Sequence, residues 1–310
     1  MLNIQKNINI APYTTFKIGG PAKYFAEVNS EEDIFEALRY AKDNGLQFFI
    51  LGGGSNILVN DKGFDGLIIK MKLDDLKMDV SRGIIEIGAG VILAKIVKNS
   101  TAEGLTGLEW ASGIPGTVGG ALRGNARAFG RNIGMSVETI EALDITTLER
   151  TTYNNSECEF AYWGSMFKKN PNLIILSAKI KLEKGDAEKS QQEARNIIVK
   201  RMATPPTGSS AGSFFLNPVV FDEKLRERFE KDSGTACRDN KIPAGWLIDE
   251  VGLRGKKIGG IQVSEKHANF VINIGGGTAE EVVMLTSFVK QQVRDKLGIE
   301  LQEEIQFVGF

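Results

Sequence analysis

The amino-acid sequence predicts an α+β protein with at least two domains. Its 310 residues exceed the usual size of a single domain. Short apolar runs alternate with amphipathic segments of helical period, as in proteins that combine sheets with helices. The 35 glycines gather in clusters, some of which follow strand-like runs. Such clusters form tight turns or allow a close approach of the backbone to another group.

The first elements are predicted to be a strand, a helix and a second strand. Residues 23–28 form the first strand. Ser30 is expected to cap the helix, with Asp33 at its third position, and Gly45 to end it. The second strand, residues 47–51, runs directly into a glycine cluster, so we expect a loop at the end of that strand.

The rest of the chain is predicted to alternate in the same way. Strands are expected at residues 67–71, 84–87, 137–146 and 304–310, and helices at residues 93–103 and 187–201. A last helix begins with a capping box of Thr278 and Glu281 and ends at Gly298. The segment PPTGSS, residues 205–210, is typical of a junction between domains.

Composition excludes several classes of function. The 38 basic and 39 acidic residues leave a net charge of −1, so the basic excess that nucleic-acid binding needs is missing. No apolar run approaches the ~18 residues of a membrane span, and the first residues lack the apolar core of a secretory signal. Two distant cysteines and one histidine, His267, make a disulfide framework or a zinc site improbable. We therefore expect a protein of the reducing cytoplasm, with His267 structural and inside a strand.

Two glycine clusters have surroundings that suit a ligand. They span residues 52–56 and 111–121, and neither contains a lysine or an arginine. Backbone N–H groups in such loops can bind an anion, and two loops together suit a ligand with a central pyrophosphate. Each cluster taken alone is more often a tight turn. The GxGxxG and GxxxxGK[ST] motifs are absent, which argues against the usual dinucleotide fingerprint and excludes a P-loop.

The motifs of the chain, taken in order, resemble the UDP-N-acetylenolpyruvoylglucosamine reductase family, flavoenzymes that make UDP-N-acetylmuramate for peptidoglycan. The matching segments are TTFKIGG from Thr14, LGGGSNILV from Leu51, GLEWASGIPGTVGGAL from Gly107, AGSFF from Ala211 with Asn217-Pro218, AGWLIDEVGLRG from Ala244, QVSEKHANFVIN from Gln262 and GIELQEEIQFVG from Gly298. They cover nearly the whole chain, so the resemblance is far more specific than either glycine loop.

The resemblance implies an FAD-binding fold of the vanillyl-alcohol-oxidase (PCMH) type with a C-terminal α/β substrate-binding domain. The first FAD-binding subdomain would be residues 1–70 with 300–310, the second residues 71–200, and the substrate-binding domain residues 201–299. FAD, bound non-covalently, and NADPH are the implied cofactors. The implied FAD-binding residues are Gly52, Gly53, Gly54, Ser55, Asn56, Ser112, Gly113, Ile114, Pro115, Gly116, Thr117, Gly119, Gly120 and Asn125.

The resemblance also assigns chemistry to single residues. Reduced flavin gives a hydride to C3 of the enolpyruvyl ether, and C2 must then be protonated. Ser213 matches the family's proton donor, and Glu304 matches a glutamate that helps to hold the intermediate. The implied substrate-binding residues are Tyr162, Arg201, Asn217 and Gln262. Taken alone, Ser213 is a common loop serine and Glu304 a surface carboxylate.

Three positions depart from the family pattern. Trp163 replaces an arginine that binds the substrate carboxylate, Leu216 replaces a lysine, and Arg127 replaces a glycine. The loss of a catalytic cation can cost ~10²-fold in rate. Arg201 and Arg127 are the candidates to supply a cation, although Arg201 can equally be a favourable charge at a helix end and Arg127 is more often a solvated side chain.

Two functions of different class therefore remain open. The chain is either an active reductase, which we favour, or a catalytically weakened flavin or sugar-nucleotide binding protein. A related flavin oxidase with another substrate is a third alternative. We expect a small-molecule substrate, UDP-N-acetylglucosamine enolpyruvate, with NADPH, no metal, no nucleic-acid or membrane partner, and a monomer.

Overall fold

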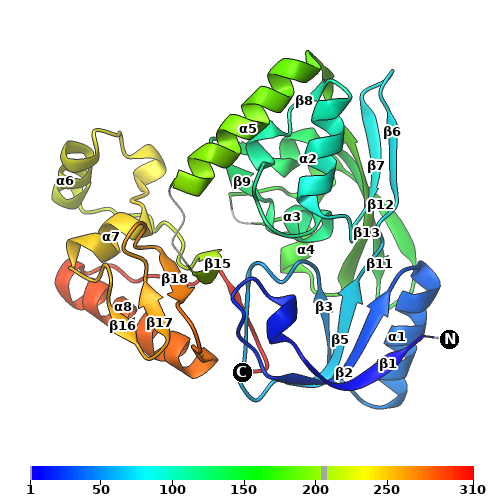
Figure 1. The fold of residues 1–310 in the computed structure, drawn as a ribbon, viewed down its shortest axis with the longest axis horizontal. Coiled ribbons are helices and arrows are strands. Elements are labelled where there is room, and N and C mark those ends of the chain that lie inside the picture. Colours follow the sequence, from blue (N-terminus) through cyan, green and yellow to red (C-terminus); the bar gives the residue numbers. More distant parts are fainter. Residues whose placement is uncertain (1, 163, 204–207) are drawn as a thin grey trace. The chain divides into compact units, whose positions relative to one another are not determined.

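The computed structural model describes residues 2–162, 164–203 and 208–310 (Figure 1). The chain divides into two compact units, and each unit takes more than one stretch of the sequence. The first unit comprises Met1–Ile8, Ala22–Gly53 and Asp65–Ala203. The second comprises Asn9–Pro21, Gly54–Phe64 and Thr204–Phe310. The predicted junction, residues 205–210, begins in a part that lies outside the described residues.

The first unit contains a small sheet covered by one helix. The strand order is β1 (Ile4–Asn9), β2 (Pro21–Val28), β5 (Phe64–Met71) and β3 (Phe48–Leu51), with β3 parallel to β5. Helix α1 (Glu31–Asp43) connects β2 to β3. Its cap is as predicted, because the Ser30 side chain accepts a hydrogen bond from the Asp33 amide at 3.1 Å. Its buried side chains belong to the same apolar core as the sheet.

A second, antiparallel sheet of the first unit has the order β12 (Arg150–Asn154), β11 (Val137–Asp144), β13 (Leu173–Lys181), β7 (Ile84–Gly88) and β6 (Leu76–Asp79). Helices α2 (Leu93–Ala102), α3 (Val118–Gly124), α4 (Met166–Lys169) and α5 (Ala187–Ala203) accompany it. A short antiparallel pair joins β8 (Leu105–Thr106) to β14 (Glu183–Lys184), and a short hairpin joins β9 (Arg127–Ala128) to β10 (Arg131–Asn132). Short 3₁₀ turns lie at Glu109–Ala111, Ile133–Ser136 and Asn155–Cys158.

Among its described residues, the second unit has a four-stranded sheet and three helices. Figure 1 labels these elements. The order is β15 (Ser209–Ser213), β18 (Phe270–Asn273), β17 (Ile261–Val263) and β16 (Lys257–Ile258). The helices of this unit are α6 (Glu223–Ser233), α7 (Ala244–Glu250) and α8 (Ala279–Leu297). Strand β19 (Gln306–Val308) pairs in parallel with β4 (Ile57–Val59). Two 3₁₀ turns, Ala11–Tyr13 and Arg238–Asn240, complete the unit.

Helix α8 begins and ends where the sequence predicts. Thr278 and Glu281 form the capping box, and Gly298 closes the helix with φ of 70°. The carboxylate of Asp61 also accepts hydrogen bonds from the amides of Ala279 and Glu280. This contact ties a segment near the start of the chain to the C-terminal part of the same unit.

Three predicted elements need correction. The strand expected to reach residue 146 ends at Asp144, because the Asp144 carboxylate accepts hydrogen bonds from the amide and hydroxyl of Thr146 and turns the chain. The expected C-terminal strand 304–310 shortens to Gln306–Val308. His267 lies in the turn before β18 instead of inside a strand. None of the described helices is long and apolar enough to cross a membrane.

Candidate functional site

The two glycine loops touch each other within the first unit. A Cβ atom on Gly53 would lie 2.4 Å from the Cα of Gly116, and a Cβ on Gly52 would lie 2.7 Å from the Thr117 hydroxyl. No side chain fits in so short a distance from another backbone, so glycine is required for this approach. Loops separated by a long stretch of sequence are therefore brought together, as a ligand held by both would require.

The second glycine loop is fixed at both ends. A Cβ on Gly119 would lie 2.9 Å from Ala89, and the Thr117 hydroxyl caps α3 by accepting from the Gly120 amide. Asn125 ends α3 in the left-handed conformation with φ of 47°. Its buried amide group donates to the carbonyl of Ala161 at 2.7 Å and accepts from Gly134. The loop thus joins two rigid elements.

Several polar groups of these loops suit a bound pyrophosphate-containing cofactor such as FAD. The Ser112 side chain is only 3% exposed, yet its hydroxyl has no hydrogen-bond partner among the described residues. The backbone amides of Gly53 and Gly116 also donate no hydrogen bond to any of the described residues. Gly53 and Gly116 are half-buried, whereas the Ser112 hydroxyl is buried. Buried polar groups without partners are rare in folded proteins, and a ligand commonly completes them. The residues present therefore fit the implied cofactor.

Lys70 is a polar neighbour of the first glycine loop that the sequence analysis missed. It interrupts an apolar run of β5, between Ile69 and Met71, and its ammonium group donates to the carbonyl of Gly52. Burial is the main reason why the pKa of Lys70 falls below its ordinary value. The interruption of an apolar strand by one lysine is the signal that would have identified it.

Arg201 lies against the second glycine loop in the first unit. Its Cδ atom would be 3.0 Å from a Cβ on Gly113, and its guanidinium donates to the carbonyl of Trp110 at 3.4 Å. The Nε atom is buried and has no partner among the described residues, and burial lowers the pKa of the group. Arg201 is expected to supply a cation to the substrate, and this role stays a prediction.

Tyr162 is partly exposed and contacts Arg127. The guanidinium carbon of Arg127 lies 3.9 Å from the Tyr162 ring centroid, and a guanidinium nitrogen donates to the Tyr162 carbonyl at 3.2 Å. Arg127 is thus exposed but bound to an aromatic side chain. Trp163, the departure from the family pattern, lies outside the described residues.

The second unit brings Ser213 and Glu304 together. Ser213 ends β15, and the Glu304 amide donates to the carbonyl of the next residue, Phe214, at 2.8 Å. An isolated antiparallel bridge joins Phe215 to Glu303. Asn56, also in this unit, donates to the Glu304 carbonyl at 3.3 Å. Both predicted catalytic residues therefore belong to one pair of neighbouring segments, and both side chains are half-buried.

A bulge in β15 sets the direction of Ser213. The register between β15 and β18 shifts between Ser210 and Ser213, and Gly212 has a φ of 83° that disfavours any residue with a Cβ. The Thr15 hydroxyl donates to the Ser210 carbonyl at 2.7 Å. Gly54 lies against the same N-terminal segment, since a Cβ there would be 2.1 Å from the Tyr13 carbonyl oxygen.

Asn269 holds the backbone next to Ser213 and was not assigned a role from the sequence. Its side chain accepts from the Phe215 amide at 2.9 Å and donates to the Phe215 carbonyl at 2.7 Å. Its own carbonyl accepts from the Phe214 amide at 2.7 Å. Asn269 is inside one of the matched segments, but only a contact across the fold identifies its partners.

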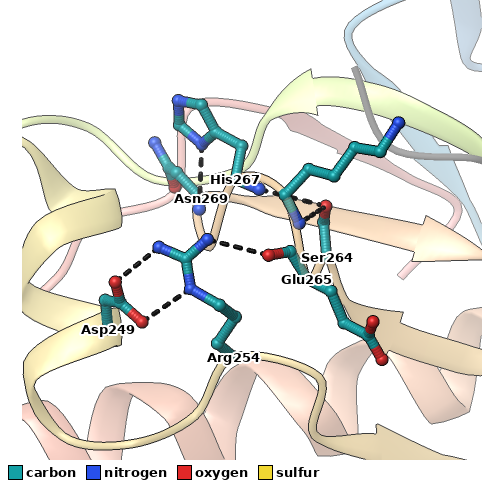
Figure 2. A network of polar contacts seen from close by, with 7 residues as sticks. Asp249, Arg254, Ser264, Glu265, His267 and Asn269 are labelled. Atoms are coloured by element: carbon teal, nitrogen blue, oxygen red, sulfur yellow. Dashed lines mark hydrogen bonds and ion pairs between the residues drawn. The ribbon is translucent and has the colours of Figure 1, made fainter. Parts of the chain in front are cut away.

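A network of polar contacts supports the turn that contains Asn269 (Figure 2). Arg254 binds the Asp249 carboxylate, with one distance of 2.7 Å, and donates to the Glu265 carbonyl at 2.8 Å. The hydrogen bond from Arg254 is the main cause that lowers the pKa of Asp249. His267 Nδ1 accepts from the Asn269 amide at 3.3 Å, and burial lowers the pKa of the imidazole. A structural role for His267, as expected, fits these contacts.

The other two predicted substrate-binding residues lie in the second unit. The Asn217 side chain accepts from the amide of Ala244, the first residue of α7, at 3.0 Å. Gln262 is 6% exposed, and its amide nitrogen donates to the Gly255 carbonyl and to the Glu265 carboxylate, each at 3.2 Å. These contacts position both side chains, and their contact with substrate stays a prediction.

The comparisons with known proteins agree with this geometry. A family model described as FAD binding domain matches residues 22–152, and a model described as UDP-N-acetylenolpyruvoylglucosamine reductase, C-terminal domain, matches residues 204–308. The fold and the glycine loops therefore define an FAD-dependent oxidoreductase, and the predicted FAD-binding fold with a C-terminal domain is confirmed.

Relatives extend the match over the full chain. The UDP-N-acetylenolpyruvoylglucosamine reductase of Solibacter usitatus is 36% identical over 99% of this chain and 97% of the relative. That of Carboxydothermus hydrogenoformans is 36% identical over 99% and 94%. The crystal structure of the Thermus caldophilus enzyme superimposes with a TM-score of 0.78 at 28% identity, covering 99% of this chain and 100% of the other. The chain belongs to the UDP-N-acetylenolpyruvoylglucosamine reductase family.

Proposed function

We propose that this chain reduces UDP-N-acetylglucosamine enolpyruvate to UDP-N-acetylmuramate, with FAD as the bound cofactor and NADPH as the reductant. The observation that supports it most is the contact of the Ser213 segment with the Glu304 segment in a chain whose family match is full-length. Bound FAD, once reduced, supplies the hydride that C3 of the substrate accepts. The residues of the chain must then bind the substrate and deliver one proton to C2.

Ser213 is the proposed proton donor to C2. It is half-buried at the end of a bulged strand, and the backbone of its neighbours is clamped by Asn269. A serine is a weak acid at its ordinary pKa, so proton transfer depends on a fixed position beside the acceptor atom. The clamp and the left-handed Gly212 fix the backbone on both sides of Ser213, which supports this role.

Glu304 is proposed to hold the reacting group while C2 becomes basic. The Glu304 amide donates to the backbone of the Ser213 segment, and the Glu304 carbonyl accepts from Asn56. These two hydrogen bonds fix the backbone from which the Glu304 side chain extends. Asn217, Gln262, Tyr162 and Arg201 are the proposed substrate contacts. Residues 52–56, 112–117, 119, 120 and 125 are proposed to hold FAD non-covalently.

Three further assignments belong to this proposal. The reaction is proposed to take place in the cytoplasm, and the protein is proposed to be a monomer. The three-part division into two FAD-binding subdomains and a substrate-binding domain also remains a proposal. The alternative of a weakened binding protein finds no support in the full-length similarity to named reductases.

The test separates the two half-reactions under anaerobic conditions. NADPH should bleach the flavin absorbance of the purified holoprotein, and the enolpyruvyl substrate should restore it. Ser213→Ala should leave bleaching nearly unchanged and slow the restoration ~10²-fold or more. Ser209→Ala, on the same strand, serves as the control with no effect on either step. If the substrate does not restore the flavin absorbance of the protein without substitutions, the proposed function is refuted. If Ser213→Ala slows both steps equally, the role of Ser213 is refuted.

A further inference from the structure

Arg127 is an exposed cation without an acidic partner. None of the ion pairs among the described residues includes it. Its guanidinium lies over the Tyr162 ring and donates to the Tyr162 carbonyl. The ring covers one face of the guanidinium, and the Tyr162 carbonyl takes one of its five N–H donors. The other N–H donors lie along the edge of the group and are able to bind an anion.

The backbone beside Tyr162 is held by hydrogen bonds. Asn125 binds the carbonyl of Ala161, the residue before Tyr162, at 2.7 Å, and its oxygen accepts from Gly134 beyond the β9–β10 hairpin. The Ala161 amide in turn donates to the Gly164 carbonyl at 2.9 Å. The backbone of Ala161, next to Tyr162, is therefore held by hydrogen bonds to Asn125 and Gly164. A cation pre-positioned in this way loses little side-chain freedom when it binds a ligand.

The β9–β10 hairpin also lies beside the second glycine loop. Phe129, at its tip, has a φ of 51°, and its ring is 5.3 Å from the guanidinium carbon of Arg201. Arg201 contacts Gly113 and the Trp110 carbonyl, which belong to that loop and its approach. A bulky residue in the left-handed region is uncommon and is found mostly where surrounding contacts impose it. The hairpin is thus directed toward the loop that is proposed to hold FAD.

We propose that Arg127 binds the carboxylate of the enolpyruvyl group and stabilises the negative charge that grows there during reduction. The inference rests on the proposed function. In that reaction the carbon that accepts the hydride must approach the flavin, and the carboxylate is attached to the adjacent carbon. An anion therefore has to lie close to the FAD-binding loops, where Arg127 provides an unneutralised charge.

The test compares two ligands that differ by the carboxylate. Binding of UDP-N-acetylglucosamine enolpyruvate and of UDP-N-acetylglucosamine to the oxidised holoprotein is measured from the change in flavin absorbance. Arg127→Gln should weaken binding of the enolpyruvyl ligand about 30-fold, which is typical of one lost charge-assisted hydrogen bond. Binding of UDP-N-acetylglucosamine, which has no carboxylate, should stay unchanged. Arg127→Lys should recover part of the loss.

Arg131→Gln is the matched control, because Arg131 is an exposed arginine on the opposite strand of the same hairpin. It should leave both dissociation constants unchanged. Unchanged enolpyruvyl binding in Arg127→Gln, or equal weakening of both ligands, would overturn the inference. If the unchanged protein binds neither ligand and is not reoxidised by substrate, the proposed function itself fails. These outcomes distinguish the two proposals.

Discussion

Replacement of Asn269 by alanine should destabilise the second unit and slow one half-reaction selectively. The change removes two buried hydrogen bonds to the Phe215 backbone, at 2.9 and 2.7 Å. Phe215 and Asn269 are only 1% and 3% exposed, so water cannot replace the lost partners. Each unsatisfied buried group costs about 1–3 kcal/mol, so we expect the two groups together to lower the free energy of unfolding by about 2–6 kcal/mol. Domains are stable by only about 5–15 kcal/mol, so this loss is easily measured.

The assay combines urea unfolding of the FAD-saturated protein with the anaerobic half-reactions. The clamp fixes the backbone that follows Ser213, so reoxidation by substrate should slow more than reduction by NADPH. Asn273→Ala, at the far end of the strand that follows Asn269, is the control, because that side chain binds Gly275, Gly277 and Phe16 instead. It should lower stability without the selective kinetic effect.

A milder variant covers the case in which Asn269→Ala does not fold. Asn269→Asp keeps an acceptor for the Phe215 amide and, when its carboxyl group is protonated, a donor to the Phe215 carbonyl. A smaller loss of stability is therefore expected at acidic pH than at neutral pH, where a buried charge would face the carbonyl oxygen. An unchanged urea midpoint in both variants would refute the reasoning. Equal slowing of both half-reactions would show that the clamp does not act through Ser213.

Two further predictions test the cofactor loop and the histidine. Gly53→Ala would place a Cβ 2.4 Å from Gly116, so FAD should bind about tenfold or more weakly in a flavin titration, whereas Gly124→Ala, with open space around it, should bind FAD normally. His267 is the only histidine, and burial lowers its pKa below the ordinary 6.5. Between the lowered pKa and 6.5 the unfolded chain binds more protons, so stability should rise with pH across that window and level off above it. His267→Gln should abolish this rise in urea midpoints measured against pH, and a rise that persists would contradict the assignment.

Local signals were sufficient for much of the fold. The caps at Ser30 and Thr278 and the glycine at position 298 are confirmed, because a cap depends on residues three or four positions away. Strand ends were less well predicted. The residues after Asp144 are compatible with a strand, and it is ended by the hydrogen bonds from Thr146 to the Asp144 side chain and from the Leu148 amide to the Asp144 carbonyl.

The partners of the site residues could not be derived from sequence periodicity. Ser213 and Glu304 were named from the resemblance, but their neighbouring backbones meet through hydrogen bonds that join distant segments. Asn269 and Lys70 were missed for the same reason. A single sequence records which residue types are available, whereas the pairing of buried donors and acceptors is decided when the segments pack together.

Asn125 shows how far such a contact can change the interpretation of a residue. The resemblance suggests a cofactor contact, and the sequence alone predicts a left-handed residue at the end of a helix. Its buried side chain binds the Ala161 carbonyl and the Gly134 amide, so it connects the hairpin of Arg127 to the segment of Tyr162. This connection holds the backbone next to Tyr162, whose ring contacts Arg127. Exposure alone would classify Arg127 as a solvated side chain, whereas its contacts with the Tyr162 ring and the Tyr162 carbonyl make it a pre-positioned cation.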